Sequence, residues 1–325
     1  MSDTVTASLW ILLGGLVAAC SNASAPPSPA GAGATPDYVV HTVQNAAVDP
    51  AISDGSGVSY AGIDAGATQR GALIVFLGGT GSAPSGYQLF SKAALREGYH
   101  VVDLDYLDQT TVGSLCLDDL ACYGKVRQEM VEGVDSSSIV QVSRADGILS
   151  RMAKTLTYLA GAYPGDGWSQ YASGGQVAWS RVVMAGFSQG AGHALWIAKH
   201  YPTNGVILFS GPVDGRVHAP SESAQWISDP SAWATPRADF RFFISTHDGY
   251  YSAIRANLIT LGFDPASVGV SVDAGVPSSP GVQLLLTSAV TVNAHPSVLS
   301  DADTPRNADG SAVYGPVWDY LLESW

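Results

Sequence analysis

Residues 181–192 read RVVMAGFSQGAG, and this short stretch says most about the fold. The run Arg181–Phe187 is apolar and short, as expected of a buried strand, and Gln189–His200 has the apolar spacing of a helix. Between them, Gly186-Phe187-Ser188-Gln189-Gly190 matches the pattern G-x-S-x-G. We therefore expect Ser188 at a sharp strand-to-helix turn, flanked by glycines because larger side chains would collide with the neighbouring elements.

Short apolar runs and helical patterns alternate on both sides of this turn. Strands are expected at 72–77, 99–104, 205–210, 240–245 and 282–287, and helices at 87–96, 139–163, 250–261 and 316–324. Residues 105–138 are expected to be mostly loop. Strands that are apolar throughout, rather than alternating, are typical of a parallel sheet covered on both faces. The fold class is therefore α/β.

Composition excludes several classes of protein. The 325 residues carry a formal net charge of −13, which argues against a nucleic-acid partner because neutralising phosphates requires a basic surface. Only 13% of residues are charged while 46% are hydrophobic, which excludes a coiled coil and a disordered chain. The length suits one large domain.

The N-terminus is typical of an export signal. Residues 9–19, LWILLGGLVAA, are too few to span a bilayer, which takes about twenty apolar residues, and they end just before Cys20. The sequence LVAAC at 16–20 resembles the bacterial lipoprotein cleavage box, although residues 1–10 contain no Lys or Arg to form the usual positive flank. The resemblance implies a signal peptide over 1–19, lipidation of Cys20 and a membrane-anchored protein of the cell envelope, outside the cytoplasm. Residues 20–36, rich in Ser, Ala, Pro and Gly, would be a flexible tether. The alternative is a frayed apolar N-terminus.

Two cysteines remain after Cys20, in SLCLDDLACYGK. An exported protein meets oxidants, so Cys116 and Cys122 are expected to form one disulfide. Two reduced thiols or a metal-binding pair are the alternatives, but no His or further Cys lies close in sequence. No HExxH or Cys/His cluster is present, so we expect no metal site and no cofactor.

The motif at Ser188, in its strand–turn–helix setting, resembles the nucleophile elbow of the α/β-hydrolase superfamily, and the resemblance extends over most of residues 37–325. It implies an α/β-hydrolase fold, with a mostly parallel central sheet and helices on both faces. It also implies that Ser188 is a nucleophile, followed in the chain by an acid and then a histidine. The alternative is a glycine turn that matches the pattern by coincidence.

A serine hydroxyl needs a histidine to take its proton. His295, in a loop shortly after the last strong strand, stands where the superfamily places this base. His193 and His200 lie on the helix that leaves Ser188 and are interpreted as structural, while His218 cannot be placed.

The histidine in turn needs an orienting carboxylate. Asp248 directly follows the strand at 240–245, the usual position in the superfamily. Asp214, one strand earlier, is the alternative acid. His247, beside Asp248, is interpreted as a loop or core residue.

The superfamily stabilises the developing oxyanion with two backbone N–H groups. One would belong to Gln189, the residue after the nucleophile. The other is expected from the loop Gly78-Gly79-Thr80-Gly81 after the first strand, with Thr80 as first choice and Gly79 as second.

These expectations combine into a serine hydrolase that cleaves carboxylic esters, small or polymeric, through an acyl-enzyme. A peptidase or a thioesterase could use the same triad, and a non-catalytic surface-binding lipoprotein could use the same scaffold. Residues 212–238 are expected to form an excursion that could act as a lid, in which Trp226 and Trp233 either roof the substrate pocket or simply anchor the loop. The sequence leaves the oligomeric state open.

Overall fold

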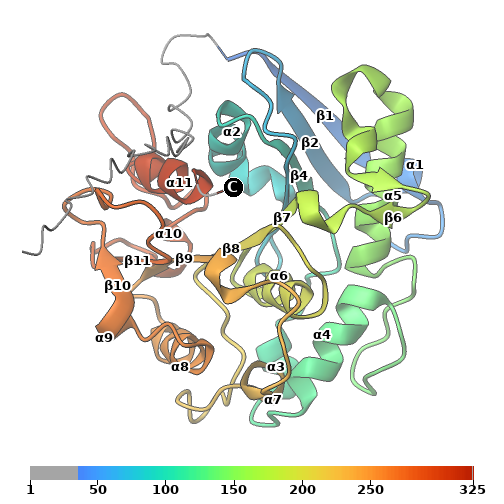
Figure 1. Ribbon diagram of the computed structural model, residues 1–325. Coiled ribbons are helices and arrows are strands. Elements are labelled where there is room, and N and C mark those ends of the chain that lie inside the picture. The colour runs from blue at the N-terminus through green and yellow to red at the C-terminus, as the bar shows by residue number, and fades with distance from the viewer. Residues whose placement is uncertain (1–35, 324) are drawn as a thin grey trace, which may run out of the picture. The chain divides into compact units, whose positions relative to one another are not determined.

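The computed structural model describes residues 36–323 and residue 325. The expected signal peptide (1–19), Cys20 and all but the last residue of the expected tether (20–36) lie outside the described residues. A nine-stranded sheet runs through the described part, in the order β1-β2-β4-β3-β7-β8-β9-β11-β10 (Figure 1). Its strands are β1 (Tyr38–Gln44), β2 (Val58–Asp64), β3 (Leu73–Leu77), β4 (His100–Leu104), β7 (Val182–Phe187), β8 (Gly205–Phe209), β9 (Phe240–Ser245), β10 (Gly269–Ser271) and β11 (Leu284–Thr287). A separate small hairpin is formed by β5 (Ala172–Ser173) and β6 (Gln176–Val177).

The sheet is mostly parallel, as the sequence predicts. Each pair from β4 to β10 is parallel, and the antiparallel pairs are β1–β2 and β2–β4 at one edge, so that β2 runs opposite to the other strands of this sheet. The register pairs Leu77 with Gly186 and Phe187 with Phe209, so β3, β7 and β8 end at the same level. Loops that follow these strands therefore gather at one edge of the sheet, where ligands bind in open α/β sheets.

Helices cover both faces of the sheet. The longer ones are α2 (Gln88–Arg96), α4 (Cys122–Glu132), α5 (Ile148–Ala162), α6 (Gln189–His200), α8 (Tyr251–Leu261) and α11 (Gly315–Leu322). Short ones are α1 (Asn45–Val48), α3 (Val112–Cys116), α7 (Gln225–Ser228), α9 (Pro265–Val268) and α10 (Ala294–Ser297), with 3₁₀ turns at Pro84–Tyr87, Pro164–Asp166, Trp168–Gln170, Trp179–Arg181 and Arg237–Asp239. No helix among the described residues combines the length and the apolar character that crossing a membrane requires.

The central strands are buried on both sides, which explains why they are apolar throughout. In β3, the side chains of Leu73, Val75 and Leu77 join one apolar cluster, together with residues of α4, α5, α6 and α8. Ile74 and Phe76 point to the opposite face and join a second cluster with residues of α2 and α11. The α/β class with helices on both faces is thus confirmed (Figure 1).

Two expectations about residues 105–163 are wrong. Residues 105–138 are not mostly loop, because they contain α3 and the eleven-residue helix α4. The helix expected at 139–163 begins only at Ile148. The preceding chain instead winds around the buried carboxylate of Glu129, which accepts hydrogen bonds from the backbone N–H groups of Ser137 and Val142 at 2.8 and 3.1 Å.

The expected disulfide between Cys116 and Cys122 is confirmed. It links the last residue of α3 to the first residue of α4. Both cysteines are buried, at 4% and 5% exposure.

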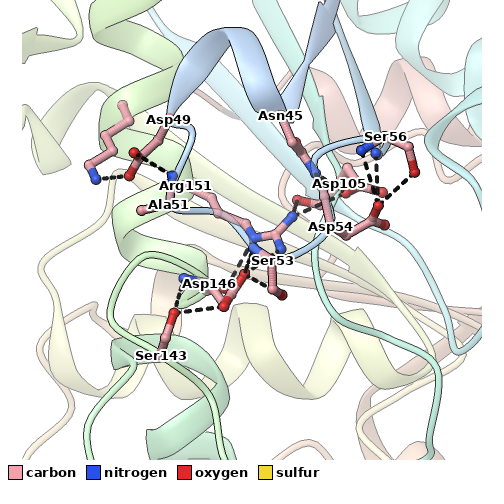
Figure 2. A network of polar contacts seen from close by, with 12 residues as sticks. Asn45, Asp49, Ala51, Ser53, Asp54, Ser56, Asp105, Ser143, Asp146 and Arg151 are labelled. Atoms are coloured by element: carbon pink, nitrogen blue, oxygen red, sulfur yellow. Dashed lines mark hydrogen bonds and ion pairs between the residues drawn. The ribbon is translucent and has the colours of Figure 1, made fainter.

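A second buried polar cluster lies around Arg151 of α5 (Figure 2). Its guanidinium donates to Asp146 and Asp105, both at 3.1 Å. Asp146 also accepts from the backbone and hydroxyl of Ser53, and Asp105 accepts from Asn45. The cluster therefore ties α5 to the end of β4 and to the turn between β1 and β2.

Candidate active site

Ser188 occupies a strained turn between β7 and α6. Its φ of +54° is rare for a residue other than glycine. The adjacent glycines are sterically required: a Cβ on Gly190 would lie 2.1 Å from the carbonyl oxygen of Leu77, and a Cβ on Gly186 would lie 2.4 Å from the backbone of Gly190. The expected collision of larger side chains at these two positions is therefore confirmed.

Ser188, His295 and Asp248 form a continuous chain of hydrogen bonds. His295 Nε2 lies 2.8 Å from Ser188 Oγ, and His295 Nδ1 lies 2.7 Å from Asp248 Oδ2. An ionised carboxylate can only accept, so it favours the tautomer with the proton on Nδ1. Nε2 is then free to accept the proton of Ser188. The sequence predicted these three residues as nucleophile, base and acid, and the fold brings them together.

The histidine and the acid are held from several sides. The hydroxyl of Ser210 donates to the backbone oxygen of His295 at 2.6 Å, and the rings of Phe187 and Tyr250 each lie 5.0 Å from the imidazole. Asp248 Oδ1 accepts from the backbone N–H of Tyr250 at 2.7 Å. The side chain of Asp248 is fully buried, while that of His295 stays 17% exposed.

The alternative acid, Asp214, is engaged elsewhere. Both of its carboxylate oxygens accept hydrogen bonds from Arg127, at 2.7 and 2.5 Å, and one also accepts from Trp226 Nε1. The carboxylate that reaches His295 is that of Asp248. Asp214 is therefore a partner of a buried arginine rather than the acid of this hydrogen-bonded chain.

The other histidines near the motif do not reach Ser188. His193 is fully buried in α6 against the ring of Tyr106. Burial and the nearby guanidinium of Arg127 lower the pKa of His193 well below its usual value. His200 lies against Trp196, and His218 is an exposed partner of Asp118.

The glycine loop after β3 lies directly beside Ser188. A Cβ on Gly79 would lie 2.8 Å from the ring of Phe187 and 3.4 Å from Ser188 Cβ. The N–H of Gly79 already donates to the hydroxyl of Tyr87 at 3.2 Å. In the described part of the chain, the N–H groups of Thr80 and Gln189 have no such acceptor. The first choices, Thr80 and Gln189, thus keep their donors available, whereas Gly79 does not.

Asp108 accepts two hydrogen bonds from the backbone of this loop and of the residue that follows it. Its backbone oxygen accepts from Gly81 N–H at 3.1 Å, and its carboxylate accepts from Ser82 N–H at 3.2 Å. Burial raises the pKa of Asp108 to about 6. Asp108 could not be predicted from sequence, because no local pattern marks an aspartate whose carboxylate accepts a hydrogen bond from a loop 26 positions away.

A pocket of about 460 Å³ opens beside Ser188 and Gln189. Its walls come from the start of α3, from the chain after β8 and from the start of α8. The lining residues are Thr80, Thr111, Val112, Gly113, Ser114, Leu117, Tyr123, Arg127, Ser188, Gln189, Val213, Asp214, Gly215, Arg216, Val217, Pro220, Gly249, Tyr250, Ser252 and Ala253. The pocket combines aliphatic and aromatic walls with a few polar groups, as is usual for small-molecule sites.

The excursion at 212–238 contributes to this pocket only through its beginning. Val213 to Val217 and Pro220 line it, whereas Trp226 and Trp233 do not. Trp226 is 8% exposed, and Trp233 packs edge-on against Phe240. Lys199 of α6 donates to the backbone oxygen of Trp226 at 2.6 Å. The tryptophans therefore anchor the loop and do not roof the pocket.

Within residues 36–323 and 325, no group of three or more His, Cys, Asp or Glu side chains could hold a metal ion.

The site offers a serine hydroxyl, a proton acceptor 2.8 Å away from it and two backbone N–H groups nearby that have no hydrogen-bond acceptor among the described residues. These are the parts that nucleophilic acyl transfer requires. No protein-family model matches the sequence, and no match was found among curated proteins.

Proposed function

We propose that this protein is a serine hydrolase with an α/β-hydrolase fold that cleaves carboxylic esters. One observation carries the proposal: Asp248, His295 and Ser188 are linked by hydrogen bonds of 2.7 and 2.8 Å at a strained strand-to-helix turn beside a pocket. A positive φ at Ser188 is costly, and such strain concentrates at functional sites.

The chemistry follows from this arrangement. Ser188 Oγ attacks the ester carbonyl carbon while His295 Nε2 takes its proton, and Asp248 stabilises the imidazolium. The N–H groups of Thr80 and Gln189 hold the oxyanion. His295 then protonates the departing alkoxide, which leaves an acyl group on Ser188. Water, deprotonated by His295, attacks this ester, and the carboxylic acid and free Ser188 are released.

A fluorophosphonate probe tests the proposal directly, because it phosphonylates activated serines. The probe should label the wild type, and Ser188→Ala should abolish both labelling and the hydrolysis of short p-nitrophenyl esters. Ser231→Ala, at an exposed position, should change neither. Folded wild-type protein that is not labelled would rule out the enzyme. Rates across acyl chains of increasing length, compared with thioester and amide substrates, would define the substrate class.

We further propose that the protein is exported and anchored to a membrane through a lipid on Cys20. The sequence LVAAC at 16–20 supports this, and the disulfide between Cys116 and Cys122 is consistent with an oxidising compartment. Cys20→Ser should move the protein from the membrane fraction to the soluble fraction. A wild type that is already soluble after expression would contradict the anchor.

A further inference from the structure

A buried ion pair forms part of the wall of the pocket. Arg127 of α4 and Asp214, which follows β8, each keep only 1% of their side-chain surface exposed. The guanidinium meets the carboxylate with two hydrogen bonds, Nε to Oδ2 at 2.7 Å and Nη2 to Oδ1 at 2.5 Å. Because desolvating two charges is costly, such a pair is weak evidence for stability by itself. Its position suggests a different use.

The same guanidinium also reaches the residue that follows the nucleophile. Arg127 Nη1 donates to the backbone oxygen of Gln189 at 3.0 Å. Gln189 is the first residue of α6, and its own N–H is one of the two proposed oxyanion donors. Arg127, paired with Asp214, therefore connects α4 to the backbone carbonyl of Gln189 by a hydrogen bond.

Helix α6 leaves room for the guanidinium of Arg127 at Gly192. A Cβ on Gly192 would lie 2.0 Å from Arg127 Nη2 and 2.2 Å from Cζ. Glycine is unfavourable inside a helix, where alanine is the best residue. The guanidinium of Arg127 occupies the space that a side chain at position 192 would fill, and this explains why a glycine stands there.

We propose that Arg127, oriented by Asp214, is a positioning residue that fixes Gln189 so that its N–H can hold the oxyanion. This inference rests on the proposed function. Arg127 acts through the main chain of Gln189, since the carboxylate of Asp214 offsets the guanidinium charge. Its effect should fall on the transition state, in which the oxyanion forms, much more than on substrate binding.

Two variants test the positioning from opposite directions. Gly192→Ala keeps both charges but forces the guanidinium away, and the new residue favours the helix. Arg127→Met combined with Asp214→Asn removes the pair without leaving a buried charge alone. For each, kcat and KM are measured with a short p-nitrophenyl ester, together with Ki for a boronic acid, whose tetrahedral adduct on Ser188 mimics the transition state.

We expect kcat to fall by about 10- to 100-fold, because displacing a group by about 1 Å can cost about 100-fold in rate. KM should stay within about threefold, and Ki for the boronic acid should rise in parallel with the loss in kcat. A purely structural role would instead lower the amount of folded enzyme and leave Ki of the folded fraction unchanged.

The cluster around Arg151 supplies a matched control (Figure 2). The side chain of Arg151 is likewise 1% exposed and paired with Asp146, yet neither residue lines the pocket. Arg151→Met with Asp146→Asn should lower the midpoint of urea unfolding but leave kcat and Ki of the folded enzyme unchanged. A loss of kcat equal to that of the Arg127 variant would overturn the positioning role.

The outcomes also separate this inference from the proposed function. Failure of the fluorophosphonate to label the folded wild type rejects the hydrolase itself. Labelling of the wild type, with kcat of folded Gly192→Ala within about threefold of it, rejects only the role of Arg127. If the double variant at Arg127 and Asp214 does not fold, Gly192→Ala decides the question alone.

Discussion

The hydroxyl of Thr80 donates a hydrogen bond of 3.0 Å to the side-chain oxygen of Gln189. The same oxygen accepts from the backbone N–H of Val112, also at 3.0 Å. One amide oxygen thus joins the glycine loop after β3, the start of α6 and the start of α3. Thr80 and Gln189 carry the two proposed oxyanion donors, so this contact directly links the two residues.

Removing the Thr80 hydroxyl should therefore slow catalysis. Thr80→Val keeps the volume but loses the hydrogen bond, which is worth about 1 kcal/mol. We expect kcat/KM to fall about five- to tenfold in the p-nitrophenyl ester assay. Thr80→Ser keeps the hydroxyl and should restore most of the rate. Equal losses in both variants would show that the methyl group matters and the hydrogen bond does not.

Asp248→Asn should lower kcat by about 10⁴, the loss seen when the acid of a triad becomes an amide. The asparagine NH₂ would face His295 Nδ1, which favours the tautomer whose Nε2 carries a proton and cannot accept one from Ser188. The double variant with Ser188→Ala should be no slower than Ser188→Ala alone, because residues that act as a unit are not additive. Additive losses would mean that Asp248 works independently of Ser188.

The parts of this site that could be predicted from sequence are those with local signals. The elbow at Ser188 is marked by an apolar run, two glycines and a helical pattern within about twenty residues. His295 and Asp248 lack such a signal, and they were predicted because each follows a strand at the position where the resemblance to the α/β-hydrolase superfamily implies a base and an acid. In the structure the two strands, β11 and β9, are parallel neighbours and end at the same edge of the sheet.

Arg127 could not be found in this way, for a physical reason. It lies on α4, where Arg127 and Glu129 are buried at 1% and 2% exposure. Buried polar residues interrupt the apolar periodicity on which helix prediction depends, so the sequence pattern predicted a loop where α4 lies. The partner of Arg127, Asp214, is 87 positions away, and no local pattern connects the two.

The disulfide should matter moderately for stability. A loop as short as the one between Cys116 and Cys122 stabilises by about 2 kcal/mol in the chain-entropy model. We expect the double variant Cys116→Ala and Cys122→Ala to lower the free energy of unfolding by about this amount in urea titrations. Reduced wild type should match it. A further loss when the variant itself is treated with reductant would contradict this assignment, since no described disulfide remains.

Asp103 should make the stability of this protein depend on pH. Its carboxyl group on β4 is 2% exposed, and burial raises its pKa from 3.8 to about 7, although hydrogen bonds from Ser91 and Gln88 oppose the shift. Between pH 4 and 7 the folded state therefore binds more protons here than the unfolded state. The free energy of unfolding must then fall as pH rises through this window.

Asp103→Asn removes this titration, so its stability relative to wild type should rise from pH 4 to pH 8. The change can reach about 4 kcal/mol, because one unit of pKa corresponds to about 1.4 kcal/mol. Urea unfolding at several pH values measures the difference, which also cancels the titration of other groups. Ser91→Ala, which deletes a donor that lowers the pKa of Asp103, should move the transition to higher pH. A difference between wild type and Asp103→Asn that does not change with pH would show that folding leaves the pKa of Asp103 unshifted.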